Sequence, residues 1–144
     1  MNTLTVPATL DSLADIAAFV LAAADTAGLP RQARYRLRLA VDELATNVIM
    51  HGCKEVQANV TPPWTIDLRA ELSDEALTVV MEDGGTPFDP RQQPAPPSIE
   101  LRPEERDIGG LGVFLALEGV DQFRYERVGD RNCNVFVVNR PPKA

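Results

Sequence analysis

The chain has 144 residues, 44% of them hydrophobic and 24% charged, with a net charge of −7. These proportions are typical of a folded globular protein, and the length suits a single domain over residues 1–144. The negative charge would repel a phosphate backbone, which argues against nucleic acid as a partner. No apolar run is long enough to cross a membrane, and the first residues lack the features of a secretory signal, so we expect a cytoplasmic protein.

Two helices are predicted in the first third of the chain. A short strand at residues 3–6 precedes apolar residues at helical spacing, and this pattern stops at Gly28. Pro30 suits a first helical turn, and the apolar pattern after it predicts a second helix from Arg31 to Met50. This second helix is the longest element that we expect.

Alternating apolar and polar residues predict two strands next, joined by a hairpin. The first strand covers residues 64–72, Ser73 to Glu75 form the turn, and the second strand starts at Leu77 and continues into Asp83. The proline-rich segment after it, residues 86–108, shows no pattern of a regular element. A connection of this length is typical of a functional lid, so we expect a lid here.

The last quarter of the chain predicts an apolar helix at residues 111–120 and strands at residues 123–127 and 135–138. Taken in order, the elements predict an α/β fold of the α+β kind. We expect a two-layer α/β sandwich, with a mixed, mostly antiparallel sheet and the helices on one of its faces.

Glu43 and Asn47 lie one helical turn apart, so a carboxylate and a carboxamide project from one face of the second helix. A surface pair that hydrogen-bonds along the helix would explain them. They would equally suit a site in which the amide oxygen binds a hard cation and the carboxylate takes a proton. Both interpretations stay open on this segment alone.

Two glycine motifs adjoin predicted elements. Asp83, Gly84 and Gly85 come directly after a strand, where glycines permit a close approach to the backbone, although an ordinary tight turn has the same composition. The motif at residues 109–112 precedes an apolar helix, whose first N–H groups could hold a phosphate, although a turn is again the simpler interpretation. The spacing fits neither a P-loop nor a dinucleotide-binding fingerprint. The order of acid–amide helix, Asp-Gly turn, lid and glycine-rich helix start nevertheless favours a nucleotide site.

The segments DELATNVIMHG, EDGGTPFDP and GGLGVFLALEGVDQFRYER resemble the N, G1 and G2 boxes of the anti-sigma factor serine kinases of the RsbW and SpoIIAB type. The resemblance covers nearly the whole chain. It implies the Bergerat (GHKL, histidine-kinase-like ATPase) fold, ATP or ADP as ligand, and Mg²⁺ as cofactor. One departure is the last strand, NCNVFVVNR, which lacks the Gly-Thr-Thr element of many related domains.

The resemblance also implies a role for each site residue. Glu43 is expected to be the catalytic base and Asn47 the Mg²⁺ ligand. Asp83 is expected to accept a hydrogen bond from the adenine amino group, while Gly85 lets the ring approach. Apart from the resemblance, Arg106 could add positive charge near the terminal phosphate, although an exposed charged loop is the simpler interpretation. The expected nucleotide contacts in the second half of the chain are Arg106, Gly109, Gly110, Leu111 and Gly112.

The activity implied by the resemblance is that of an anti-sigma factor with ATP-dependent serine protein kinase activity. Such a protein holds a sigma factor or phosphorylates a serine on a STAS-domain antagonist, and we expect it to be a homodimer. An ATP-binding switch that selects partners without phosphoryl transfer is the alternative, although the presence of Glu43 argues against it. A detached catalytic domain of a histidine kinase is less favoured, because the only histidine, His51, lies within the N box itself.

Overall fold

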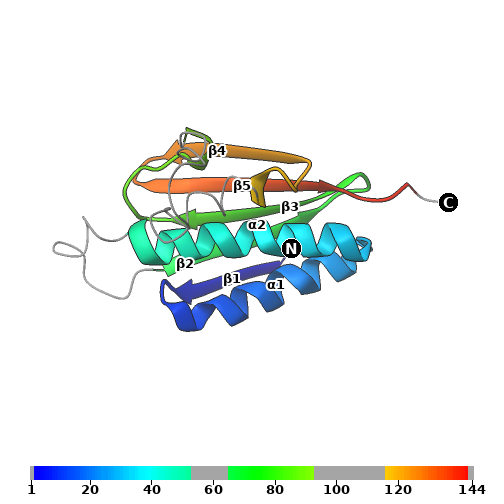
Figure 1. Ribbon diagram of the computed structural model, residues 1–144, viewed down its shortest axis with the longest axis horizontal. Helices are drawn as coiled ribbons and strands as arrows, with labels where there is room; N and C mark the ends of the chain where they lie inside the picture. Colours follow the sequence, from blue (N-terminus) through cyan, green and yellow to red (C-terminus); the bar gives the residue numbers. More distant parts are fainter. Residues whose placement is uncertain (1, 53–64, 93–115, 143–144) are drawn as a thin grey trace, which may run out of the picture.

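A computed structural model describes residues 2–52, 65–92 and 116–142 of the chain. Two long helices and a five-stranded sheet make up this part (Figure 1). The helices are α1 (Leu13–Thr26) and α2 (Arg31–Asn47). The strands are β1 (Asn2–Pro7), β2 (Thr65–Leu72), β3 (Ala76–Asp83), β4 (Gln122–Val128) and β5 (Arg131–Asn139). Most of the predicted lid and the first half of the predicted helix at residues 111–120 lie outside the described residues.

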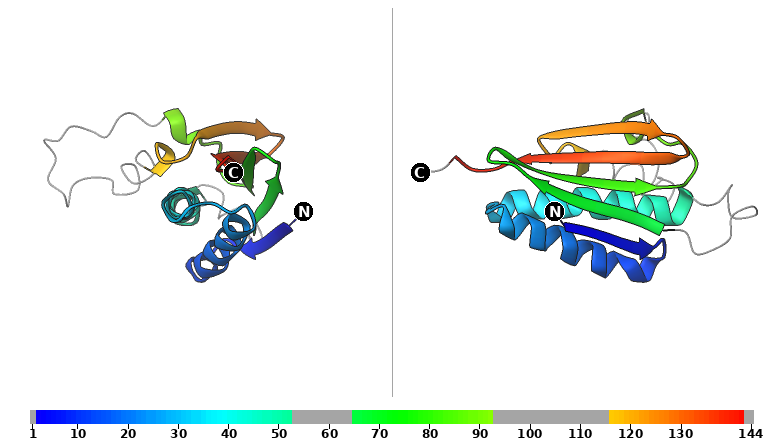
Figure 2. Two further views of the ribbon diagram at one scale, coloured as in Figure 1. Left: turned by 90° about the vertical axis from the view of Figure 1, so that its right-hand side faces the viewer. Right: turned by 180° about the vertical axis from the view of Figure 1, so that it is seen from behind.

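The strands follow the order β1-β2-β3-β5-β4, and each neighbouring pair of described strands is antiparallel. Both helices cover one face of this sheet (Figure 2). α1 packs against α2, β1 and β3, and α2 also contacts β5. The predicted two-layer α/β sandwich with a mostly antiparallel sheet is therefore confirmed. Among the described helices, none combines the length and the apolar character needed to cross a bilayer.

The turn between the helices is built around Gly28. α1 ends at Thr26, and Gly28 takes a φ of +71°, in the left-handed region. Its N–H donates to the carbonyl of Asp25 at 3.0 Å, and the N–H of Leu29 donates to the carbonyl of Ala24 at 3.1 Å. These two bonds form a Schellman motif, in which the buried Leu29 covers the end of the helix. The predicted stop at Gly28 is confirmed by this geometry.

The second helix begins at Arg31 as predicted and differs from its prediction at its other end. Pro30 has extended backbone angles and is the N-cap of α2 rather than its first helical residue. α2 ends at Asn47, before the predicted end at Met50, and Val48–Gly52 form a π-helical turn. The spacing of apolar residues over a single turn is too short a pattern to distinguish a π-helical turn from an α-helical one. Turns of this kind are rare and often lie at functional sites.

The core lies between the sheet and the helices, and β3 shows how it is built. Leu77, Val79 and Met81 are buried at alternate positions of the strand. Asp83 holds the next position of this inward row and is 1% exposed. A carboxylate therefore stands where the pattern calls for an apolar side chain. The same buried cluster includes Val20, Leu37, Val41, Leu44, Ile66, Leu68 and Phe136.

The segment after β3 needs one further correction. The composition of this segment predicts no regular element, but Pro90–Gln92 form a 3-10 turn. The Asp89 carboxylate accepts a hydrogen bond from the N–H of Arg91 at 2.9 Å, as a capping side chain does. This local contact and the fixed φ of Pro90 produce a turn in a segment whose composition suggests none.

Candidate functional site

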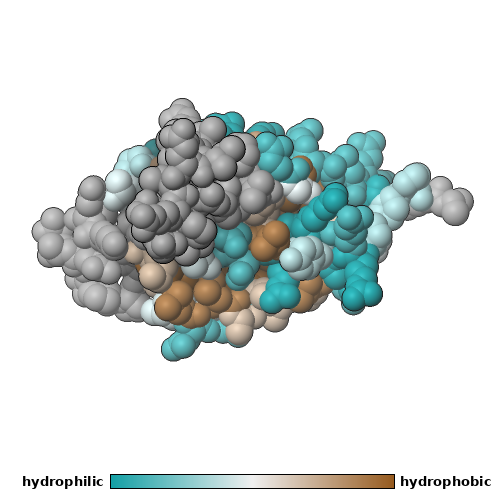
Figure 3. All heavy atoms as spheres, in the orientation of Figure 1, coloured by the Kyte–Doolittle hydropathy of each residue, from teal (hydrophilic) through white to brown (hydrophobic). Residues whose placement is uncertain are grey.

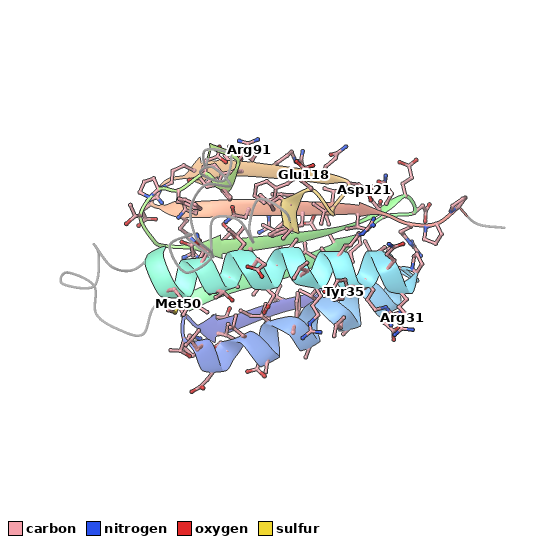
Figure 4. All side chains as sticks on the ribbon, viewed as in Figure 1. Arg31, Tyr35, Met50, Arg91, Glu118 and Asp121 are labelled. Atoms are coloured by element: carbon pink, nitrogen blue, oxygen red, sulfur yellow. The ribbon has the colours of Figure 1, made fainter. Side chains whose placement is uncertain are left out.

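Three elements have their ends close together at one end of the molecule: the last turn of α2, the last residue of β3 and the first residues of β5 (Figure 1). Asp83 pairs with Asn132 in the ladder between β3 and β5. Met50, just after α2, and Arg91, in the turn after β3, lie at the same end (Figure 4). Asp83 is buried on the face that the helices cover, so its carboxylate lies on the same side of the sheet as α2.

The carboxylate of Asp83 has two unequal oxygens. Oδ1 accepts two hydrogen bonds, from the N–H of Gly85 at 2.9 Å and from the amide of Asn132 at 3.0 Å. Oδ2 is buried and has no hydrogen-bond partner among the described residues. A buried carboxylate oxygen without a partner is costly in free energy. The arrangement therefore leaves an acceptor open for a donor that these residues do not supply.

Burial raises the pKa of Asp83 above its ordinary value of 3.8, because the ionised form loses hydration. The hydrogen bonds from Asn132 and Gly85 act in the opposite direction, and so do the positive charges of Arg131 and Arg127. These four contacts all favour the ionised form, in which both oxygens are acceptors. The charge at this position is thus set by a balance between burial and local donors.

The loop after β3 is held in place from β4 and β5. Arg127 on β4 donates to the carbonyl of Gly85 at 2.7 Å, and Asn132 on β5 donates to the carbonyl of Thr86 at 3.0 Å. Neither Gly84 nor Gly85 has a positive φ, so the backbone conformation does not require these glycines. Gly85 is buried, and its role in letting a base approach stays a prediction.

Sequence reasoning did not find Asn132 and Asn134. These side chains are 4% and 2% exposed, at alternate positions of β5, and Oδ1 of Asn134 is also buried without a partner among the described residues. Asn134 pairs with Met81, two residues before Asp83, so the two unpartnered oxygens belong to adjacent strands. A signal was present in the sequence, because asparagines hold two positions of an alternating pattern that is otherwise apolar.

Glu43 and Asn47 are both half-buried on α2, and no hydrogen bond joins them within the part of the chain that the structure describes. The geometry therefore does not support a hydrogen-bonded surface pair. Asn47 is the last residue of α2, directly before the π-helical turn. Mg²⁺ is commonly held by one or two protein oxygens together with phosphates, and the Asn47 amide oxygen suits such a ligand set.

The other predicted contacts lie in the second half of the chain, outside the described residues. They are Arg106, Gly109, Gly110, Leu111 and Gly112. Their contribution stays a prediction. The described part of the candidate site consists of Asp83 with its loop and the pair on α2.

The sequence matches known proteins over most of its length. A family model described as a histidine kinase-like ATPase domain matches residues 6–138. The chain belongs to this family. The serine-protein kinase RsbW of Listeria monocytogenes is 33% identical over 96 residues, and that of Listeria innocua is 32% identical over 96 residues. Each alignment covers 64% of this chain and 57% of the relative, so the chain spans little more than half the length of these relatives. The resemblance to the RsbW type is confirmed at the level of the family.

Proposed function

We propose that this chain is an anti-sigma factor with ATP-dependent serine protein kinase activity in a partner-switching system. It binds ATP or ADP with Mg²⁺, holds a sigma factor, and phosphorylates a serine on a STAS-domain antagonist. The family supports nucleotide binding, and the names of the relatives support the kinase activity. The observation that carries the proposal is the buried oxygen of Asp83 that has no hydrogen-bond partner among the residues that the structure describes.

Adenine supplies the donor that Oδ2 of Asp83 lacks, namely its exocyclic amino group. Guanine presents a carbonyl oxygen at that position, so an ionised Asp83 would face a second acceptor and would favour adenine. Gly85 is buried beside the carboxylate and has no side chain to stand between the base and the loop. Asn134 adds a second open acceptor on β5. These features support an adenine pocket at the ends of β3 and β5.

α2 supplies the groups for the phosphate end of the nucleotide. Asn47 holds Mg²⁺ through its amide oxygen, and the ion neutralises charge on the triphosphate when bound. Glu43, one turn earlier, takes the proton of the acceptor serine as the serine oxygen bonds to the terminal phosphorus and the bond to ADP breaks. Charge neutralisation matters here because the chain carries a net charge of −7, which repels a triphosphate.

A phosphoryl-transfer assay tests this proposal. The chain is incubated with γ-labelled ATP, Mg²⁺ and a cognate STAS protein, as wild type, as Glu43→Gln and as Asn47→Ala. We expect the wild type to label a serine, and Glu43→Gln to bind ATP but to transfer more slowly by a factor of roughly 10²–10⁴. Asn47→Ala should lose the Mg²⁺-dependent part of ATP binding. The matched controls are Glu75→Gln and Asn139→Ala, which change exposed side chains in the β2–β3 hairpin and at the end of β5.

The outcomes separate the parts of the proposal. A wild type that binds ATP yet labels no cognate serine is not a kinase, and the ATP-binding switch then describes it. A wild type that binds neither ATP nor ADP contradicts the nucleotide site altogether. Co-purification with a sigma factor, and its loss when the unphosphorylated STAS protein is added, tests the anti-sigma activity.

The proposal includes a homodimer. Apolar side chains gather over α1 on the face that bears the helices (Figure 3). The 14 residues of α1 include just two charged ones, Asp15 and Asp25. An exposed apolar surface of this kind suits a protein–protein contact. Light scattering should give twice the mass of the chain, and a monomer mass at micromolar concentration would contradict the dimer.

A further inference from the structure

The side chain of Asn132 is hydrogen-bonded at every polar position. Its amide nitrogen donates to Oδ1 of Asp83 and to the carbonyl of Thr86, both at 3.0 Å. Its Oδ1 accepts from the N–H of Phe88 at 3.2 Å and from the hydroxyl of Tyr125 at 2.5 Å. An asparagine side chain offers two donors and two acceptor sites, so all four are in use. Asn132 is therefore a buried link between the middle of β4, the start of β5 and the loop after β3.

The surroundings of Asn132 determine which end of its amide faces Asp83. The N–H of Phe88 can only donate, and the carbonyl of Thr86 can only accept. A reversed amide would set oxygen against oxygen at Thr86 and donor against donor at Phe88. The observed orientation satisfies both backbone groups, and in this orientation a donor necessarily points at Oδ1 of Asp83.

We propose that Asn132 is a positioning residue for base recognition, which occupies Oδ1 of Asp83 and thereby directs Oδ2 at the nucleobase. The inference rests on the proposed function and deepens it. Within the described residues Oδ1 has two donors and Oδ2 has none, so the two oxygens are unequal. Rotation of the carboxylate would break the bonds from both Asn132 and Gly85. Asn132 does not itself contact the base in this proposal.

Asn132 also acts on the charge of Asp83. Its hydrogen bond lowers the pKa of Asp83, against the rise that burial causes. Without Asn132, a proton binds Asp83 more readily. A protonated Oδ2 is a donor, which repels the amino group of adenine and can donate to the carbonyl oxygen of guanine. Loss of Asn132 is therefore expected to weaken ATP binding and to narrow the preference for ATP over GTP.

The other charged groups around Asp83 stay in place when Asn132 is changed. Arg131 on β5 and Arg127 on β4 both lower the pKa of Asp83, and Arg131 is paired with Asp67 on β2 at 2.6 Å. On α2, which covers this face of the sheet, the acidic group of the candidate site is Glu43. A change in the pH dependence of ATP binding by an Asn132 variant can then be assigned to the lost amide.

The test is Asn132→Leu, which keeps the size of the side chain and removes its donors and acceptors. ATP and GTP, each with Mg²⁺, are titrated into the full chain by calorimetry from mildly acidic to neutral pH. We expect the Kd for ATP to rise about tenfold at neutral pH. The fall in ATP affinity on acidification should begin at a higher pH in the variant than in the wild type. A carboxyl NMR titration of the nucleotide-free protein should show a higher pKa for Asp83 in the variant than in the wild type.

Two more variants complete the design. Asn139→Leu removes an exposed amide from the end of the same strand and should change neither affinity nor pH dependence. Tyr125→Phe removes just the hydroxyl that donates to Asn132, so it should shift affinity and the pKa of Asp83 in the same direction by a smaller amount, roughly twofold in Kd. Because Tyr125→Phe keeps the ring and the amide, it decides the question if Asn132→Leu fails to fold.

The possible results are distinguishable. A wild type that does not bind ATP contradicts the proposed function, while the titration of Asp83 still shows whether Asn132 acts on its carboxylate. If the wild type binds ATP and the variants at Asn132 and Tyr125 match it in affinity, base selectivity and the pH at which ATP affinity falls, the inference is wrong. A loss of affinity with an unchanged pKa of Asp83 and unchanged base selectivity would mean that Asn132 only supports the loop, and it also overturns the inference.

Discussion

Two carboxylates of one short segment, Asp83 and Asp89, have opposite environments. Asp83 ends β3, is buried, has one oxygen without a partner among the described residues, and has its pKa raised by burial. Asp89 precedes a 3-10 turn, and its two oxygens accept from the guanidinium of Arg91 at 3.0 and 2.9 Å. This contact with Arg91 holds the pKa of Asp89 below its ordinary value.

The difference shows what identifies a ligand-binding carboxylate. Residue type and motif do not, because both aspartates belong to the segment that resembles the kinase family. The hydrogen bonds of Asp89 are completed within its own turn, so a structural role explains it. Asp83 needs a further donor, and buried polar groups that the fold leaves open are found preferentially at functional sites.

The largest expected effect comes from Asp83→Asn. The variant keeps an oxygen that accepts from Gly85 and Asn132, but it places an NH₂ group where Oδ2 stood, facing the adenine amino group. We expect ATP affinity to fall by roughly tenfold to a hundredfold, as for a lost hydrogen bond to a charged group. Thermal stability should be equal or higher, because the buried charge is gone. Calorimetry and thermal unfolding measure both.

The control is the same change at the other carboxylate, Asp89→Asn, which should leave ATP affinity unchanged. If Asp83→Asn binds ATP as the wild type does, Asp83 is not part of the site. A large fall in the melting temperature would instead make Asp83 a structural residue like Asp89, and the contrast between the two carboxylates would disappear.

Lowering the pH should change the contributions of Asp83 and Asp89 to stability in opposite directions, an effect almost as large as that of Asp83→Asn. Asp83 has a raised pKa in the folded state, so the folded protein binds its proton first, and the contribution of Asp83 to the free energy of unfolding increases as pH falls through that pKa. Asp89 has a lowered pKa, so its contribution is present above about 3.8 and is lost as pH falls through the folded value. ATP affinity should fall with acid as Asp83 takes its proton.

Urea unfolding at a series of pH values checks these signs. The free energy of unfolding of the wild type, minus that of Asp83→Asn, should rise toward acid pH, while the difference from Asp89→Asn should fall. Two differences of the same sign would contradict the environments that we assign to the two carboxylates.

A moderate effect is expected from the loop that separates the two carboxylates. Arg127→Met removes the hydrogen bond to the Gly85 carbonyl and one positive charge near Asp83, while its apolar stem is retained. We expect the Kd for ATP to rise by roughly threefold to tenfold, the equivalent of about 1 kcal/mol. Arg124→Met, an exposed position on the same strand, is the control. Equal ATP affinities in the two variants would show that ATP binding does not depend on the hydrogen bond from Arg127 to the Gly85 carbonyl.

Much of the fold could be predicted because its signals are local. The alternation in β2 and β3 and the hairpin between them are determined by neighbours in the sequence: the Ser73 hydroxyl accepts from the N–H groups of Glu75 and Ala76 at 3.2 and 3.0 Å. Asp83 could be found in the same way, as a polar residue that follows a strand and precedes glycines. Its role in adenine binding came from the family resemblance and stays a prediction.

The features of the site that the sequence does not predict depend on contacts between distant segments. Asn132 reaches Asp83 across 49 positions of the chain, and their contact exists only in the register that pairs β3 with β5. No local pattern specifies that register, so the sequence of β5 shows only that a Gly-Thr-Thr element is absent and does not predict a contact between its asparagines and Asp83. The π-helical turn after Asn47 was missed for a similar reason, because periodicity over one turn does not measure its width.

The smallest expected effect comes from Asp89→Ala, and it is the strictest test of the comparison. The variant loses the cap on the N–H of Arg91 and an ion pair whose arginine is half-exposed, so we expect a loss of stability of about 1 kcal/mol. ATP affinity and base selectivity should stay at the wild-type level, because the turn at Pro90–Gln92 contributes to the loop but not to the open acceptor at Asp83. A double-mutant cycle with Asp83→Asn, read by calorimetry, should show no coupling in binding. Coupling above about 0.5 kcal/mol would mean that the turn helps to hold Asp83, and that the two carboxylates work as one unit rather than in separate roles.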